Sequence, residues 1–341
     1  MPRGTAALIL TDVNRRYLTG FPSSLGYLFV SGEEAVFYTD SRYIEAAEKN
    51  VSGCAVRLFS RLSDTLEEAV RELCPDRLLV EEEVTVSTLR RLEALTPCPV
   101  EADTLSEAIS ALRRIKSAGE TDCIRQAQRI AEEAFDRLLP RIRPGVSERE
   151  LAIELDYTMR RLGAEEISFE TICVSGANSS MPHGVPGERR LQKGDFITFD
   201  FGAVWKGYHS DMTRTVALGS VDADMERVYA TVLSAQETAL AALRPGLPCS
   251  DGDRAARSVI EAAGYGRYFG HGTGHSAGLE IHEEPRLSPN CTAVLEPGMI
   301  MTVEPGIYLP GRFGVRIEDM VRITETGCEN LTGTSKELLI L

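Results

Sequence analysis

The sequence predicts an α/β fold of two domains, the second of which combines helices and strands (α+β) in two similar halves. Three observations support this prediction. Short apolar segments alternate with helical ones over residues 5–105, a strongly helical stretch follows, and two glycine-bounded runs in the second half of the chain share spacing and chemistry. A chain of 341 residues with 43% apolar content is also too long for one ordinary hydrophobic core.

The first region shows the alternation expected of a small α/β domain. Strands are predicted at residues 6–10, 27–30, 35–39, 55–59 and 77–80, and helices at residues 43–49, 63–73 and 86–95. The Gly, Pro and polar residues between them suit turns. We find no catalytic group of residues in this region, so we expect it to serve as a scaffold, an oligomerisation surface or the roof of a cleft.

The helical stretch at residues 105–139 is rich in Glu, Arg and Ala. Residues 117–120 suit a break between two helices, and we place the boundary there, which gives domains 1–116 and 117–341. Beyond the boundary the predicted order is helix, helix and two strands, and this order repeats after Gly219. The four helices are predicted at residues 121–139, 147–162, 222–243 and 251–263.

The repeat can be followed residue by residue. Residues 194–202 (GDFITFDFG) parallel residues 298–306 (GMIMTVEPG), and both runs place an acid six residues after their first glycine. Each run is followed by a strand that carries a further acid. The four acids are Asp200, Asp211, Glu304 and Glu318. Shared order, spacing and chemistry favour a structural repeat over chance.

These acids are expected to face one site. Side chains alternate along a strand, so Asp200 shares a face with Thr198 and not with Phe199. If only one of these acids were present, a structural role would be a simpler interpretation than metal binding. Such a carboxylate would accept hydrogen bonds or pair with Arg214 or Arg316. Four acids at repeated positions in apolar strands cannot all stay ionised unless positive charge neutralises them. A pair of metal ions supplies that charge.

The histidines gather in the same half of the chain. All five lie within one stretch of 100 residues: His183, His209, His271, His275 and His282. Three of them belong to residues 270–283 (GHGTGHSAGLEIHE), whose glycines suit a loop folded around a site. Phosphate binding by this loop is not supported, because it lacks Gly-Lys-Ser/Thr and the strand–glycine–helix order. Oxygen ligands with one imidazole suit manganese, cobalt, iron or zinc, and the choice among them stays open.

Composition excludes several classes of function. The formal net charge of −14 and the lack of a dense Lys/Arg run argue against nucleic acid as a partner. No run of about 18 apolar residues is present, so we expect neither a membrane span nor a signal-peptide core. The cysteines lie 20 or more residues apart, which predicts reduced thiols and a cytoplasmic location. They are Cys54, Cys74, Cys98, Cys123, Cys173, Cys249, Cys291 and Cys328.

Together the motifs resemble one known family, the pita-bread metallopeptidases, which include methionine aminopeptidase, aminopeptidase P and prolidase. The resemblance covers almost the whole chain. It rests on residues 178–184 (NSSMPHG), 200–202 (DFG), 210–215 (SDMTRT), 302–306 (TVEPG), 315–319 (VRIED) and the loop around His275. It implies a small creatinase-like N-terminal α/β domain followed by a pseudo-twofold pita-bread catalytic domain, as in aminopeptidase P and prolidase. Relatives usually begin with an amphipathic helix, whereas only five residues precede the first predicted strand here.

The resemblance also implies roles for the metal-binding residues. Asp200 would bind one ion, and His275 and Glu304 the other. Asp211 and Glu318 would bridge the two. The implied cofactor is a pair of divalent metal ions, with manganese favoured over cobalt, iron or zinc, that activates a water as nucleophile. Glu304 would accept the proton of that water.

Further residues resemble positions around the substrate. Positions that contact the substrate or stabilise the tetrahedral intermediate are matched by His183, His271 and His282. Arg316 would orient the substrate or Glu318, and Thr213 would support Asp200. His209 has the weakest claim, and we expect it to be structural.

The expected substrates are peptides with proline as their second residue. The leading prediction is an Xaa-Pro aminopeptidase acting on longer peptides, and the alternative is an Xaa-Pro dipeptidase (prolidase) restricted to dipeptides. An inactive pita-bread binding protein, or a metal-independent creatinase-like hydrolase, is disfavoured because all five metal-binding candidates are present. A nucleotide-binding α/β protein would need a phosphate motif that the first domain lacks. We also expect a homodimer.

Overall fold

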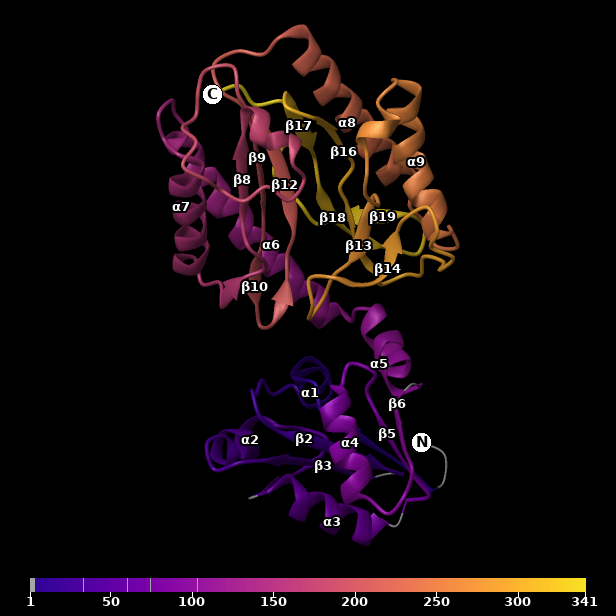
Figure 1. Cartoon of the computed structure of the whole chain (residues 1–341). Helices are drawn as coiled ribbons and strands as arrows, with labels where there is room; N and C mark the ends of the chain where they lie inside the picture. The colour runs from indigo at the N-terminus through magenta and orange to yellow at the C-terminus, as the bar shows by residue number, and fades with distance from the viewer. Residues whose placement is uncertain (1–3, 33, 60, 74, 103) are drawn as a thin grey trace. The chain divides into compact units, whose positions relative to one another are not determined.

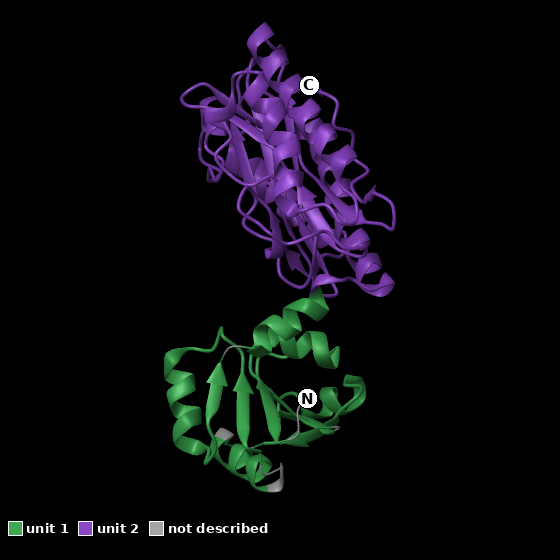
Figure 2. Ribbon diagram, turned by 90° about the vertical axis from the view of Figure 1, so that its right-hand side faces the viewer, with its two compact units in different colours: residues 1–113 green, residues 114–341 purple. Residues whose placement is uncertain are grey.

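The computed structural model describes residues 4–32, 34–59, 61–73, 75–102 and 104–341 (Figure 1). The chain divides into two compact units, residues 1–113 and 114–341, which are coloured separately in Figure 2. Each unit buries its own hydrophobic clusters. Each therefore meets the description of a domain.

The first unit is a six-stranded sheet with helices on both faces. The strand order is β4-β3-β2-β1-β5-β6, and β1 pairs antiparallel with β2 and parallel with β5. The strands are β1 (Thr5–Ile9), β2 (Tyr27–Ser31), β3 (Glu34–Thr39), β4 (Ala55–Leu58), β5 (Arg77–Val80) and β6 (Val100–Ala102). The helices are α1 (Asp12–Thr19), α2 (Ile44–Asn50), α3 (Leu62–Leu73), α4 (Val86–Leu95) and α5 (Thr104–Arg114). Alternate residues of β1 enter separate cores: Leu8 packs on one face and Ile9 on the other.

The predicted strands and helices of this unit are confirmed to within one residue at each end. The sequence pattern missed α1, because its buried face is polar. Asn14 donates to the Glu81 carboxylate at 2.9 Å, and Arg15 donates to the carbonyl of Ser23 at 2.9 Å. Such a helix lacks the apolar periodicity by which helices are recognised. The pattern also missed β6, which is only three residues long.

The second unit repeats one arrangement of two helices and a sheet. α6 and α7 cover the sheet β12-β9-β8, and α8 and α9 cover the sheet β14-β13-β15-β18-β19. The helices are α6 (Ala118–Leu138), α7 (Glu148–Arg161), α8 (Ala223–Ala242) and α9 (Cys249–Ala262). The strands of these sheets are β8 (Ile172–Ser175), β9 (Phe196–Phe201), β12 (Met212–Ala217), β13 (Gly274–Ser276), β14 (Glu283–Leu287), β15 (Ile300–Val303), β18 (Asp319–Ile323) and β19 (Cys328–Asn330). Short elements complete the unit: β7 (Glu166–Ile167), β10 (Ala203–Trp205), β11 (Tyr208–His209), β16 (Gly306–Leu309), β17 (Phe313–Arg316), η1 (Leu139–Arg141), η2 (Gly176–Ser180) and η3 (Gly266–Tyr268).

The two halves of this unit agree in detail as well as in outline. The N–H of Gly145 donates to the carbonyl of Leu191, and the N–H of Gly246 donates to the carbonyl of Leu295, both at 2.9 Å. The first glycines of the two runs singled out in the sequence both adopt positive φ, 88° and 92°. The predicted structural repeat is therefore confirmed.

One face of β9 is anchored in the core of the first half. Ile197, Phe199 and Phe201 are fully buried in a cluster with α6 and α7, as the predicted alternation requires. Both phenylalanine rings contact Phe135, with ring centroids 5.5 Å apart. Burial of each ring contributes about 1.5–3 kcal/mol, so the strand is firmly held. Its opposite face is thereby fixed as well, and that face carries Asp200.

None of the described helices combines the length and the apolar content that a bilayer span requires. The seven cysteines in the described ranges are free. Cys74, which was expected to be reduced like the others, lies outside those ranges.

Candidate active site

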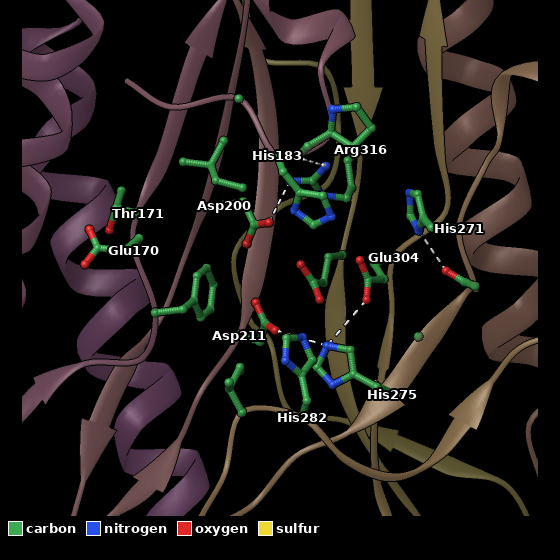
Figure 3. A pocket seen from close by; sticks show the side chains of 18 of the residues that line it. Glu170, Thr171, His183, Asp200, Asp211, His271, His275, His282, Glu304 and Arg316 are labelled. Carbon is green, nitrogen blue, oxygen red and sulfur yellow. Dashed lines mark hydrogen bonds and ion pairs between the residues drawn. The ribbon is translucent and has the colours of Figure 1, made fainter. Parts of the chain in front are cut away.

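A cavity of about 710 Å³ in the second unit is lined by every residue predicted to bind metal or substrate (Figure 3). The first half contributes His183, Asp200 and Asp211. The second half contributes His271, His275, His282, Glu304, Arg316 and Glu318. Segments far apart in the sequence therefore meet where the two halves face each other.

The metal-binding candidates lie on strands or directly beside their ends. Asp200 is on β9 and His275 on β13. Asp211 precedes β12, Glu304 follows β15, and Glu318 precedes β18. All five are buried or half-buried. The sheet ladders hold the backbone at these positions, while the strand ends leave the side chains open to the cavity.

His275 faces two of the carboxylates through its Nε2 atom. That atom lies 3.5 Å from Asp211 Oδ2 and 3.5 Å from Glu304 Oε1 (Figure 3). The other ring nitrogen, Nδ1, lies 3.0 Å from the carbonyl of Ser276, which can only accept, so Nδ1 carries the proton and Nε2 presents a lone pair. Burial lowers the pKa of His275 to about 4, which keeps the ring neutral at pH 7. A neutral imidazole held in this way is the form that binds a metal ion.

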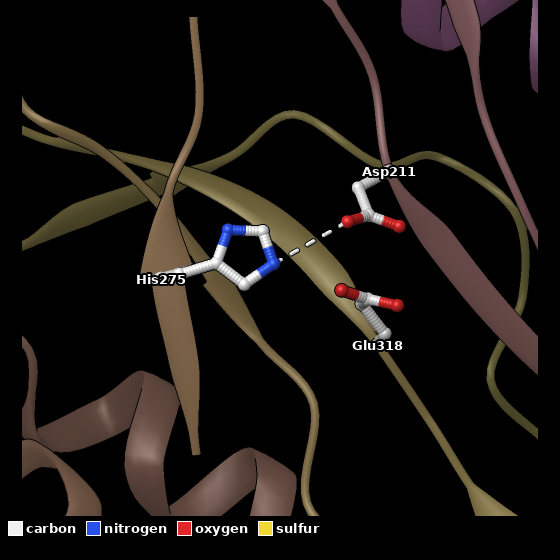
Figure 4. Close-up of side chains that lie close together, drawn as sticks. All are labelled: Asp211, His275 and Glu318. Atoms are coloured by element: carbon white, nitrogen blue, oxygen red, sulfur yellow. Dashed lines mark ion pairs between the residues drawn. The ribbon is translucent and has the colours of Figure 1, made fainter. Parts of the chain in front are cut away.

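The oxygen atoms of the cluster fit divalent metal ions. Asp211, His275 and Glu318 each place a ligand atom within 4.8 Å of the other two (Figure 4). Three buried oxygens have no hydrogen-bond partner within the described part of the chain: Asp200 Oδ1, Asp211 Oδ1 and Glu318 Oε1. Each such atom costs about 1–3 kcal/mol if it stays unpaired. A cation coordinated by these oxygens would satisfy them, so the donor set suits a metal centre.

Burial and mutual repulsion make protonation of these carboxyls favourable. Burial, followed by the charges of Glu318 and Asp200, raises the pKa of Asp211 well above its usual range. Burial and the charge of Glu304 do the same to the pKa of Glu318, and burial raises the pKa of Glu304 to about 7. Divalent cations would remove this repulsion, as bound ions do at sites rich in carboxylates.

Arg316 holds Asp200 at the edge of the cluster. Its Nη2 atom donates to Asp200 Oδ2 at 2.6 Å (Figure 3), and its Nε atom donates to the Thr213 hydroxyl at 3.0 Å. The Thr213 hydroxyl in turn donates to Glu318 Oε2 at 2.7 Å. The Thr213 hydroxyl thus connects Arg316 with Glu318, and the support predicted for Asp200 passes through Arg316. Arg214 pairs with Asp319 at 2.8 Å and not with any of the predicted metal-binding acids.

His271 has both ring nitrogens engaged within the protein. Nδ1 lies 2.8 Å from the carbonyl of Gly272, so this nitrogen is the donor, and Nε2 accepts from the Tyr308 hydroxyl at 2.8 Å. Arg316 donates to that hydroxyl, also at 2.8 Å. Burial lowers the pKa of His271 to about 4, which agrees with a neutral ring. The three side chains form a directed chain of hydrogen bonds that ends at His271.

The remaining histidines differ in their surroundings. His183 and His282 line the cavity, and Figure 3 shows them on opposite sides of the carboxylates. His209 does not line it. Its Nδ1 atom lies 2.9 Å from the Ser168 hydroxyl, which agrees with the structural role expected of it.

Sequence reasoning missed two polar residues of the site, Tyr308 and Arg286. Tyr308 lies on β16, beyond the run around Glu304 that drew attention. Arg286 lies on β14, directly opposite His275 in the ladder. The only signal for Arg286 was its closeness in sequence to the glycine-rich loop, since strand pairing cannot be read from one strand alone.

Metal uptake near pH 7 should release protons. Burial raises the pKa values of Asp211, Glu318 and Glu304 in the metal-free protein, and a metal ion must displace any proton that these carboxyls hold. We expect Mn²⁺ binding to release protons, with apparent affinity falling as the pH drops below about 7, the pKa of Glu304. Titration calorimetry at pH 7 in buffers of different ionisation enthalpy measures the number of protons released. Uptake without proton release would contradict the raised pKa values.

Comparison with known proteins agrees with this geometry. Residues 122–325 match the metallopeptidase family M24, and residues 4–115 match the creatinase/prolidase N-terminal domain. A protein named Xaa-Pro dipeptidase from Pyrococcus furiosus is 39% identical, over 97% of this chain and 94% of that protein.

Two solved structures resemble the whole chain. An Xaa-Pro dipeptidase from Bacillus anthracis has a TM-score of 0.96 and 41% identity, covering 98% of this chain and 95% of its own. An X-Pro aminopeptidase from Thermotoga maritima has a TM-score of 0.94 and 36% identity, covering 99% and 97%. The expected pita-bread fold and creatinase-like first domain are thereby confirmed. The chain belongs to metallopeptidase family M24 and is a metal-dependent peptidase.

Proposed function

We propose that this peptidase hydrolyses the bond between an N-terminal residue and a following proline, with Xaa-Pro dipeptides as its main substrates. The observation that carries the proposal is Arg286, which lines the cavity directly opposite His275. A guanidinium there can bind the free carboxylate that a dipeptide carries beside its only peptide bond. The names of the Pyrococcus furiosus and Bacillus anthracis relatives support the same choice.

The side chains of the cluster would hold two divalent ions. Asp200 would bind one ion, and His275 and Glu304 the other. Asp211 and Glu318 would bind both. We propose manganese, with cobalt, iron or zinc as alternatives, because oxygen donors outnumber the single nitrogen. When bound, such a pair supplies Lewis acidity and lowers the pKa of water.

Glu304 is suited to move the proton that the attacking water loses. A carboxylate beside the attacking water can accept a proton and return it. The Oε1 atom of Glu304 accepts a hydrogen bond from the Thr302 hydroxyl at 3.2 Å, which orients the carboxylate. The proton would pass to the proline nitrogen, which leaves as a secondary amine.

His183 and His282 are placed to assist at the substrate carbonyl. They flank the carboxylates (Figure 3), and burial lowers the pKa of His282, so that its ring offers one N–H while staying neutral. Such donors stabilise the oxygen that gains charge in the tetrahedral intermediate. His271 differs, since Tyr308 already occupies its Nε2 atom. We assign His271 to holding Tyr308 and, through it, Arg316.

Part of the cavity wall suits a proline ring. Phe169, Ile172, Val185 and Ile281 line the cavity together with the polar residues. A proline residue has no backbone N–H, so it can lie on an apolar wall without leaving a donor unpaired. An ordinary residue at this position would bury its N–H without a partner.

The test compares dipeptides with tripeptides. Protein stripped with a chelator and reloaded with Mn²⁺ should hydrolyse Xaa-Pro faster than Xaa-Pro-Yaa. Arg286→Gln should raise KM for the dipeptide by about 10- to 100-fold, the worth of one hydrogen bond to a charged group, and change the tripeptide little. Arg312→Gln, at an exposed arginine that pairs with Asp224, is the matched control and should change neither.

Two outcomes would contradict this proposal. Equal losses on both substrates would remove Arg286 from carboxylate binding. Turnover that survives complete chelation would exclude the two-metal mechanism.

An Xaa-Pro aminopeptidase, the leading prediction from the sequence, is the second candidate. The side chain of Arg286 is 54% exposed, so the cavity is open to solvent on the side where a longer peptide would continue. The Thermotoga maritima neighbour carries the name X-Pro aminopeptidase. Preferential cleavage of tripeptides in the same assay would decide for this candidate.

A further inference from the structure

Glu148, in the first turn of α7, is a fully buried carboxylate outside the metal cluster. Its Oε1 atom accepts hydrogen bonds from the N–H of Ser175 at 2.7 Å, from the hydroxyl of Ser175 at 2.8 Å and from the amide of Asn178 at 3.1 Å. Its Oε2 atom accepts from the N–H of Gly187 at 3.1 Å. Several donors of this kind are needed before a carboxylate can be buried so deeply.

These donors stand at the two ends of one loop, residues 175–187. Ser175 ends β8 and leads into the loop, whereas Gly187 lies at its far end. The N–H of Arg149, next to Glu148 on α7, donates to the carbonyl of Gly187 at 3.0 Å. The Glu148 carboxylate, with the backbone beside it, therefore ties the two ends of the loop together, and Arg189 also donates to the Ser175 hydroxyl at 2.6 Å.

The tip of the same loop carries His183 into the cavity. Arg316 donates to the carbonyl of Pro182 at 3.3 Å, and the N–H of Gly314 donates to the Ser179 hydroxyl at 2.9 Å. In Figure 3 His183 lies on the side of the cavity occupied by Arg316. These contacts hold the tip from the second half, and Glu148 holds the base from the first, so the placement of His183 depends on both.

The repeat shows that the fold itself does not demand an acid at this position. The N–H of Glu148 donates to the carbonyl of Arg189 at 3.1 Å. At the equivalent place in the second half, the N–H of Cys249 donates to the carbonyl of Ala293 at 2.8 Å. α9 thus begins with a buried cysteine where α7 begins with a buried glutamate. The carboxylate is present only in the half whose loop carries His183.

We infer that Glu148 is a positioning residue, which sets the place of His183 in the active site by closing the base of its loop. The inference rests on the proposed function, in which His183 assists at the substrate carbonyl. Glutamine has the same shape as glutamate, but one of the two carboxylate oxygens is replaced by an NH₂ group. That NH₂ group cannot accept a hydrogen bond from the N–H and O–H groups that now donate to Glu148. Glu148→Gln therefore opens the base of the loop without changing its volume.

Kinetics of the Mn²⁺-loaded enzyme test this inference. Glu148→Gln should lower kcat for an Xaa-Pro dipeptide by about 10- to 100-fold through a displaced His183, with KM and metal content unchanged. Glu150→Gln, the same change at an exposed residue of the same helical turn, should leave kcat unchanged. In a His183→Ala background, Glu148→Gln should have little further effect, because the group that it positions is gone. Equal losses of kcat in both backgrounds, with a lowered Tm, would show a merely structural role and overturn the inference.

A second measurement does not depend on turnover. Amide hydrogen exchange over residues 176–187 should quicken in Glu148→Gln and stay as in wild type in Glu150→Gln. If wild type fails to cleave Xaa-Pro peptides while exchange changes as expected, the proposed function fails and the closure of the loop by Glu148 stands. Unchanged exchange in this loop overturns the inference. Should Glu148→Gln not fold, Asn178→Ala removes one donor at one end, and the same two readouts decide.

Discussion

Replacement of Asp211 by asparagine should abolish turnover and leave the fold intact. We expect a loss of about a thousandfold or more in kcat, because the carboxylate lies within reach of both His275 and Glu318 and would be shared by the two ions. The metal-free variant should unfold at the same temperature as wild type or higher. The pKa of Asp211 is higher in the folded protein than in the unfolded chain, so above the ordinary carboxyl pKa the need to ionise or protonate this group lowers the free energy of unfolding. Asparagine carries no charge and removes this destabilisation.

Two measurements test Asp211→Asn. Turnover of an Xaa-Pro dipeptide with Mn²⁺ reports the catalytic loss, and thermal unfolding with and without Mn²⁺ reports metal binding. The rise in Tm that the metal causes in wild type should shrink in the variant. Asp224→Asn, at a partly exposed residue that pairs with Arg227 and Arg312, should behave as wild type in both measurements. Near-normal turnover of Asp211→Asn would show that Asp211 is not a shared ligand.

Replacement of Arg316 by lysine should lower kcat by about a hundredfold although the positive charge is kept, because lysine lacks the planar set of donors that several partners need. The guanidinium contacts Asp200, Thr213 and Tyr308 at once, whereas one ammonium cannot reach all three. The free Asp200 carboxylate should then weaken the binding of one ion, so activity should recover in part at high Mn²⁺.

The control for this variant is Arg312→Lys, at an exposed arginine in the turn before β17. It should change neither kcat nor the Mn²⁺ dependence. If Arg316→Lys kept wild-type turnover at low Mn²⁺, the orientation of Asp200 by Arg316 would be unimportant for catalysis.

Much of the fold could be predicted because its elements carry local patterns. Short apolar strands alternate with helical segments in the first unit, and the two runs in the second unit place an acid at the same distance from a glycine. That spacing made Asp200 and Glu304 stand out together and pointed to a repeat. The polar face of α1 has no such pattern, since Asn14 and Arg15 are buried through hydrogen bonds that only the tertiary structure supplies.

The parts of the site that escaped prediction depend on contacts between strands. Arg286 reaches the cavity because β14 pairs with β13 in one particular register, and a shift by one residue would turn it away. Tyr308 matters through the bonds that it makes to His271 and Arg316. Glu148 looks like an ordinary helix-capping acid in the sequence, and its role follows only from the loop that it closes.

The residues proposed to bind metal are divided between the two halves, and this division bears on when the centre can assemble. Asp200 and Asp211 belong to the half that is synthesised first, and Glu318 to the half that is synthesised last, so no ribosome-bound fragment of the first half can assemble the centre. In the metal-free protein, burial raises the pKa values of Asp211 and Glu318, so protonation of these carboxyls would lower the charge of the empty centre. Both halves must therefore have folded together before all five of these residues can meet a metal ion.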